Sequence, residues 1–175
     1  MRVLITVEDE LYGGAVVDFL ASDGWAPGTM FKILHAVEPS YVGDRVTAVY
    51  GNDLQNEILK ERTEYGQKLV AEIKDELQKK LGPDFPVETN VTIGRPHHVI
   101  LHVAEDWKAD MIAMGSHGRK GFSKFLLGSI SLAVLSNANC SVIIVRLPGE
   151  SKKEKESAKS EKGKAHRSHA KASAK

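Results

Sequence analysis

The sequence contains a single cysteine, Cys140, few aromatic residues and no long apolar run. One cysteine cannot form a disulfide within the chain, which excludes a disulfide-stapled secreted domain. No stretch approaches the roughly 20 apolar residues of a membrane-spanning helix. The start, MRVLITVEDE, also lacks the long apolar core behind a basic segment that marks a signal peptide. We therefore expect a cytoplasmic protein.

The charges are spread unevenly along the chain. Residues 151–175 carry nine Lys and Arg against three Glu, which leaves residues 1–150 with a net charge of −5. An acidic domain is a poor match for a broad nucleic-acid-binding face. Residues 149–175 contain no aromatic or large aliphatic side chain, so we expect a disordered basic tail with at most weak contacts to acidic partners. We expect one globular domain over residues 1–148.

Short apolar runs alternate with longer periodic segments along the domain. The runs predict strands at 3–7, 30–37, 87–93, 110–114 and 142–147, and the periodicity predicts helices at 13–21, 55–81, from 97 onward and 130–137. Residues 41–52 show no clear period and are interpreted as a loop. This alternation predicts an α/β fold in which a parallel sheet is covered by helices on both faces.

The most distinctive stretch is MGSHGRKGFSKFLLGSIS, which runs from Met114 to Ser131. Gly115 and Gly118 are three apart, and Gly128-Ser129 follows after nine intervening residues. Glycines let the backbone approach an anion, and a helix starting at Ser129 would add its unpaired amides and dipole. The spacing is neither that of a P-loop nor that of G-x-G-x-x-G, so we interpret it as a different kind of phosphate site.

Distant residues should meet this stretch at one edge of the sheet. Ligands of open parallel sheets bind outside the carboxyl ends of the strands. If the fourth strand lies beside the first, the loop at Glu8 faces Gly115 and the end of the second strand at Ala36 closes one side. Such a site has an acidic corner, a backbone edge and an anion cradle, which are the features that a nucleotide requires.

The glycine-serine spacing resembles the ATP-binding motif of the universal stress protein family. The segments IAMGSHGRKGFSKFLLGSIS, NANCSVIIVR and GRPHHVILHVAEDWKADMI are similar to the corresponding parts of that family, and the likeness covers about residues 1–148. The resemblance implies a five-stranded, adenine-nucleotide α-hydrolase-like, Rossmann-like three-layer sandwich. It also implies ATP or a related adenine nucleotide (ADP or AMP) as ligand, and homodimers that pair through the last strand, Val142–Leu147.

By the same resemblance, specific positions have expected roles. The expected phosphate-binding residues are Gly115, Gly118, Gly128 and Ser129, and Ala36 would offer its backbone to adenine. The expected pocket further includes Glu8, Met114, Ser116, His117, Arg119 and Ile130.

The sequence departs from the family at the end of the first strand, where Glu8 replaces the usual Asp. Glu8, Asp9 and Glu10 together could bind Mg²⁺ through the phosphates, or repel the phosphates if no metal is present, although solvated strand ends of this kind are common. His98 and His102 have the spacing of helical metal ligands, but with no third ligand evident we assign them to the surface or the helix start.

We expect a stress-response regulatory protein that acts through nucleotide-dependent conformation or dimerisation. The alternatives are a nucleotide-free dimeric interaction module of the same fold and, third, an enzyme such as a weak ATPase or a nucleotidyl transferase of a related α/β class. The sequence offers no catalytic base for hydrolysis and no His-x-Gly-His, so we do not expect an enzyme, although slow hydrolysis is compatible with the sequence.

Overall fold

A computed structural model of the protein describes residues 1–39, 53–116 and 127–147. Five strands alternate with four helices in these ranges: β1 (Arg2–Thr6), α1 (Glu10–Ala21), β2 (Met30–Val37), α3 (Asp53–Leu81), β3 (Val87–Ile93), α4 (Pro96–Asp106), β4 (Met111–Gly115), α5 (Ser129–Asn137) and β5 (Ser141–Val145). The loop expected at 41–52 and the tail expected at 149–175 lie outside the described residues.

All five strands are parallel and form one sheet in the order β3-β2-β1-β4-β5. This confirms the predicted fold class and places β1 at the centre, with the end of β4 beside it. Thr6 at the end of β1 aligns with Leu34 of β2 on one side and with Met114 of β4 on the other. The three strand ends that the sequence analysis brought together therefore meet at one edge.

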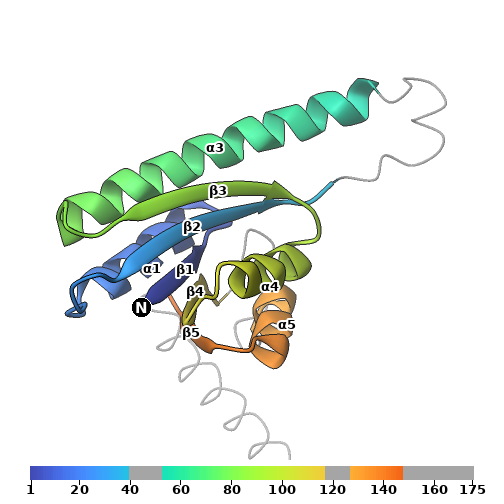
Figure 1. The fold of residues 1–175 in the computed structure, drawn as a ribbon. Helices are drawn as coiled ribbons and strands as arrows, with labels where there is room; N and C mark the ends of the chain where they lie inside the picture. The colour runs from blue at the N-terminus through green and yellow to red at the C-terminus, as the bar shows by residue number, and fades with distance from the viewer. Residues whose placement is uncertain (40–52, 117–126, 148–175) are drawn as a thin grey trace, which may run out of the picture.

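Helices cover both faces of the sheet (Figure 1). On one face, α1 and α3 pack on buried residues that include Val3, Ile5 and Ile33. On the other, α4 and α5 pack on a second buried cluster that includes Leu4 and Leu34. No helix in the described ranges is long and apolar enough to cross a membrane. The cytoplasmic location stays a prediction.

Helix α1 begins earlier than its apolar periodicity predicted. The side-chain Oδ1 of Asp9 accepts a hydrogen bond from the amide of Tyr12 at 2.9 Å, which makes Asp9 the N-cap. Asp is a favoured N-cap because its carboxylate satisfies an amide that has no partner within the helix. The helix therefore starts at Glu10 instead of Gly13, the predicted start.

Helix α3 is the longest element and lies along the sheet beside β3, extending past the strand ends at its Asp53 end (Figure 1). It packs closely against β2 at Gly66, where an added Cβ would lie 2.5 Å from Cδ2 of His35. His35 is 7% exposed, and its Nδ1 lies 2.8 Å from the carbonyl oxygen of Val7. Because a carbonyl only accepts, Nδ1 carries the hydrogen. His35 thus links α3 to the residue that follows β1.

Candidate functional site

A cleft with about 510 Å³ of empty space, partly open to solvent, lies at the carboxyl edge of the sheet. It is bounded by the ends of β1, β2 and β4 and by the beginnings of α1, α4 and α5. The residues that line it are Thr6, Val7, Glu8, Tyr12, Leu34, Ala36, Pro96, Ile100, Met114, Gly115, Ile130 and Ser131.

The floor of the cleft is mostly apolar. Leu34 and Met114 flank Thr6 in the sheet register, and Leu34 is fully buried. Ile100 of α4 and Ile130 of α5 form walls above them. A floor of this kind accommodates a flat, weakly polar group such as a nucleobase better than it does a charged one.

One edge of the cleft presents unpaired backbone groups. In a parallel sheet, alternate residues of a strand direct their N–H and C=O to the same neighbouring strand. The carbonyl of Leu34 accepts from the amide of Val7 at 3.0 Å, so Leu34 and, two residues on, Ala36 face the β1 side. Since β1 ends at Thr6, the backbone N–H and C=O of Ala36 have no backbone partner in the part of the chain that the structure describes. A donor and an acceptor are thereby left side by side at the cleft.

His35 lies beside this break in the ladder. The Val7 carbonyl, which would be the next acceptor for β2 if the ladder continued, accepts from the His35 ring at 2.8 Å. The ladder between β1 and β2 ends one step before Ala36. The His35 ring also fixes the residue that precedes Glu8.

Gly115 has a packing role in the fold, apart from the phosphate contact that was predicted for it. Its φ is not positive. An added Cβ would lie only 2.8 Å from Cδ1 and 2.9 Å from Cβ of Tyr12. Gly115 therefore provides room for Tyr12 of α1 to pack across the end of β4. A side chain at position 115 would collide with Tyr12, and this packing alone explains the glycine.

Hydrogen bonds tie the end of β4 to the start of α5. The Gly128 amide donates to the Ser116 carbonyl at 2.8 Å, and the Ser131 hydroxyl donates to the Gly115 carbonyl at 3.0 Å. The Gly128 amide is thus used within the protein. The Leu132 amide begins the helical ladder by bonding to Gly128, which leaves the three preceding amides, Ser129 to Ser131, without acceptors inside α5. These amides and the helix dipole provide the positive end of the site.

The three acidic residues after β1 are separated. Glu8 lines the cleft, whereas Asp9 caps α1 and Glu10 is exposed in its first turn. Within the described ranges, no group of three or more His, Cys, Asp or Glu side chains could hold a metal ion. The interpretation of the three as a shared metal site is therefore wrong. A single carboxylate beside the cleft still fits Mg²⁺ bound mainly through ligand phosphates.

Comparison with known proteins identifies the family. The sequence profile of the Universal stress protein family matches residues 1–146. The chain belongs to this family. Universal stress protein A homolog 2 of Coxiella burnetii is 36% identical over 118 residues, which cover 67% of this chain and 74% of that protein. Universal stress protein MJ0577 of Methanocaldococcus jannaschii is 34% identical over 94 residues, covering 54% of this chain and only 56% of the relative.

Solved structures of universal stress proteins share the fold. The structure of MJ0577 superposes with a TM-score of 0.69 at 25% identity, covering 85% of this chain and 96% of that one. A universal stress protein in complex with cAMP gives a TM-score of 0.56 at 19% identity, covering 83% and 96%. A family member from Arabidopsis thaliana with AMP bound gives 0.55 at 12% identity, covering 86% and 94%.

The expected site residues of this universal stress protein fall into three groups. Glu8, Ala36, Met114, Gly115 and Ile130 line the cleft. Ser116, Gly128 and Ser129 lie at the junction of β4 with α5, outside the cleft lining. The remaining three, His117, Gly118 and Arg119, lie outside the described residues.

The sequence analysis did not select seven of the lining residues: Thr6, Val7, Tyr12, Leu34, Pro96, Ile100 and Ser131. For two of them, the sequence contained a pattern that could have indicated their place in the site. Leu34 shares a strand face with Ala36 because side chains alternate, and Ser131 interrupts an apolar helix. Tyr12 carried no local signal, because its contact with Gly115 joins residues far apart in the chain.

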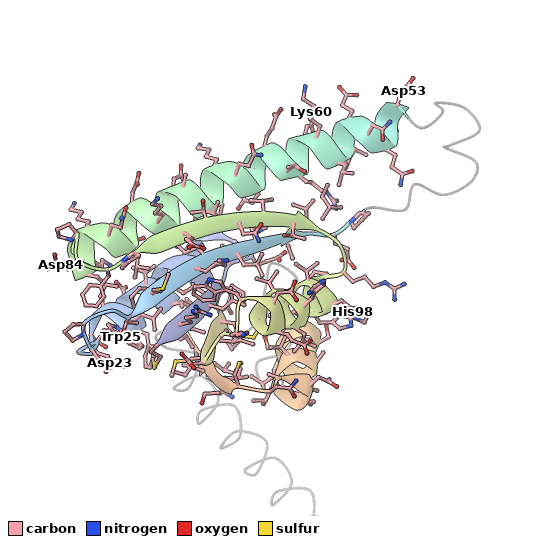
Figure 2. The ribbon with its side chains drawn as sticks, in the orientation of Figure 1. Asp23, Trp25, Asp53, Lys60, Asp84 and His98 are labelled. Atoms are coloured by element: carbon pink, nitrogen blue, oxygen red, sulfur yellow. The ribbon has the colours of Figure 1, made fainter. Side chains whose placement is uncertain are left out.

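The histidines of α4 lie apart from the cleft lining. His98 lies at the start of α4 and points away from the sheet (Figure 2). His102 pairs with Asp106 one turn later, with Nδ1 3.0 Å from Oδ2, and both side chains are largely exposed. The assignment of these residues to the surface and the helix start agrees with their places.

Proposed function

We propose that this universal stress protein binds an adenine nucleotide in the cleft and acts as a stress-response regulator through nucleotide-dependent conformation or dimerisation. The observation that carries the proposal is the placement of three features: the backbone edge of Ala36, which has no backbone partner in the described ranges, the apolar floor, and the amides at the start of α5 that have no acceptor within that helix. The Ala36 edge and the apolar floor suit the base, and the amides at the start of α5 suit the phosphates.

The base would lie on the floor against Ala36. A backbone N–H beside a C=O matches the N1 acceptor and the 6-amino donor of adenine. The phosphates would lie toward the amides of Ser129 to Ser131, joined by Gly118, His117 and Arg119 as the family motif implies. Glu8 would accept from ribose hydroxyls or hold Mg²⁺ that accompanies ATP and neutralises its phosphates.

Related structures support the ligand class. Universal stress proteins have been solved in complex with cAMP and dAMP, and one from Arabidopsis thaliana with AMP. We infer that ATP, ADP or AMP is the ligand here. We also infer that the protein is a binding protein and not an enzyme: general-base catalysis needs a titratable group at the reacting atom, and Glu8, the carboxylate of the described cleft lining, is assigned here to the ribose or to Mg²⁺.

We further propose a homodimer that pairs through the last strand. β5 is an edge strand, and its Val142, Ile143 and Ile144 remain half-buried. Exposed, apolar strand edges tend to pair with another chain. Sedimentation velocity over a concentration series, with and without ATP, tests this. A monomer at every concentration contradicts it.

Calorimetric titration tests nucleotide binding. We expect AMP, ADP or ATP with Mg²⁺ to bind the wild type. Ser129→Glu should weaken ATP binding about tenfold or more, because a carboxylate at the helix start repels phosphate, while the same carboxylate favours the helix dipole and leaves the fold intact. Ser129→Gln is the matched neutral control and should bind nearly as the wild type does.

Two outcomes contradict the proposal: no heat at millimolar nucleotide, or equal affinity of the Glu and Gln variants. The alternative is a nucleotide-free interaction module. It is favoured by the longer Glu8 side chain and by the Gly128 amide, which already bonds to Ser116. That alternative predicts no binding and a dimer that is indifferent to ATP.

A further inference from the structure

Thr6 combines two properties at the centre of the cleft floor. Its relative exposure is 9%, and it lines the cleft. Along β1, Val3 and Ile5 belong to the cluster under α1 and α3, whereas Leu4 belongs to the cluster under α4 and α5. Since side chains alternate, the Thr6 side chain faces α4 and α5, which is the side of the cleft.

The hydroxyl of Thr6 has no hydrogen-bond partner within the residues that the structure describes. Two other buried hydroxyls illustrate the contrast: Thr29 donates to the carbonyl of Ala26 at 2.8 Å, and Ser131 donates to that of Gly115 at 3.0 Å. A buried hydroxyl without a partner is unfavourable, and such groups in native proteins call for an explanation. Valine has nearly the same shape and would fill this position without that cost.

The surroundings indicate what the hydroxyl pairs with when the cleft is filled. Its neighbours on the same face are the apolar side chains of Leu34 and Met114, and Ile100 closes the space above. The amides of α5 that suit phosphate lie near the end of β4, where Gly128 bonds to Ser116 and Ser131 bonds to Gly115. The part of a nucleotide that fits between Leu34, Met114 and Ile100 is the base, because it is flat and largely apolar with polar atoms at its edge.

We propose that Thr6 is a specificity-determining residue whose hydroxyl pairs with a polar atom of the nucleobase. This inference rests on the proposed nucleotide binding. The base would then be held by two strands: by the Thr6 hydroxyl of β1 and by the backbone of Ala36 of β2. In the ligand-free protein the buried hydroxyl lowers the free energy of unfolding, and it gains its hydrogen bond when the nucleotide binds.

Thr6→Val tests the proposal, with Thr6→Ser as the control that retains a hydroxyl. Without ligand, the Val variant should melt at a higher temperature than the wild type, because a buried unpaired hydroxyl is replaced by a methyl group. With AMP, calorimetry should show a loss of affinity of about 5- to 20-fold for Val and much less for Ser. Opposite effects on stability and affinity distinguish a ligand contact from a structural role.

A ligand series separates a base contact from a sugar contact. The Thr6→Val loss should be the same factor for AMP, 2′-deoxy-AMP and 3′-deoxy-AMP. If the loss disappears for one deoxy ligand, the hydroxyl contacts that ribose oxygen and the base assignment is wrong. Equal AMP affinity of the wild type and the Val variant overturns the role of Thr6 alone. A wild type that binds none of the three refutes the proposed function itself, and this inference with it.

Discussion

The contact between Gly66 and His35 gives a quantitative prediction about how α3 is held on the sheet. Glycine in the middle of a 29-residue helix is unfavourable by about 1 kcal/mol relative to alanine. On propensity alone, Gly66→Ala should therefore stabilise the protein. In the fold, however, the new Cβ would lie 2.5 Å from Cδ2 of His35 and 3.2 Å from Cγ1 of Val91.

The His35 ring has little room to move away. It is 7% exposed, its Nδ1 is bonded to the Val7 carbonyl at 2.8 Å, and Tyr65 packs against it with ring centroids 6.0 Å apart. Overpacking in such a site costs about 3 kcal/mol, at the upper end of the usual range. After subtraction of the helix propensity gain, Gly66→Ala should lower the free energy of unfolding by about 2 kcal/mol.

The sign should reverse when the ring is absent. His35→Ala is itself destabilising, because it removes a buried side chain and a hydrogen bond. In that background, Gly66→Ala meets no ring atom and should raise the free energy of unfolding by up to about 1 kcal/mol. Equilibrium urea unfolding of the four proteins, followed by circular dichroism, gives the coupling energy, which we expect to be about 3 kcal/mol. Equal effects of Gly66→Ala in both backgrounds would refute the reasoning.

Three further predictions concern separate contacts. Gly115→Ala should lower the free energy of unfolding by about 1 to 3 kcal/mol in urea, because its Cβ meets Tyr12; a neutral effect contradicts the packing. Hydrogen bonds from Lys80 to Asp18 and Glu76 raise the Lys80 pKa above its ordinary value of 10.5. Lys80→Met should therefore lower the free energy of unfolding by at most about 1 kcal/mol at pH 7. The stability difference between the wild type and this variant should vanish as the pH rises past the raised pKa. Burial, and to a lesser extent the charge of Asp110, raise the pKa of the Cys140 thiol above its ordinary value of 9.0. At pH 7, Ellman's reagent should therefore modify Cys140 far more slowly in the folded than in the urea-unfolded protein. Equal rates contradict this.

The order of elements was predictable because each carries a local signal. β2 was predicted with the bounds that the structure shows, since its apolar run is bordered by turn residues and by Glu38-Pro39. The start of α1 was placed three residues late, because the capping bond from Asp9 is a property of a single side chain and not of periodicity. The sequence analysis assumed only that the fourth strand lies beside the first, and the sheet order bears out that one adjacency. The places of the other strands were not predicted.

The site was predictable in place and less so in detail. The strand ends at Glu8, Ala36 and Gly115 meet as the rule for parallel sheets predicts. The packing of Gly115 was not predicted, because the partner that excludes a side chain there, Tyr12, is about a hundred residues away in sequence. Likewise, the sequence could not show that the buried Thr6 hydroxyl finds no partner among the described residues, because its neighbours come from other strands and helices.

The central claim is that an adenine nucleotide lies in this cleft, between β2 and the start of α5. The most direct test is two-dimensional NMR of ¹⁵N-labelled protein titrated with AMP. We predict that the amide signals of Ala36 and of Ser129 to Ser131 shift with a common saturating dissociation constant, whereas those of the Asp53 end of α3 do not move. No shifts at millimolar AMP, or shifts that saturate only at residues remote from the cleft, would contradict the account.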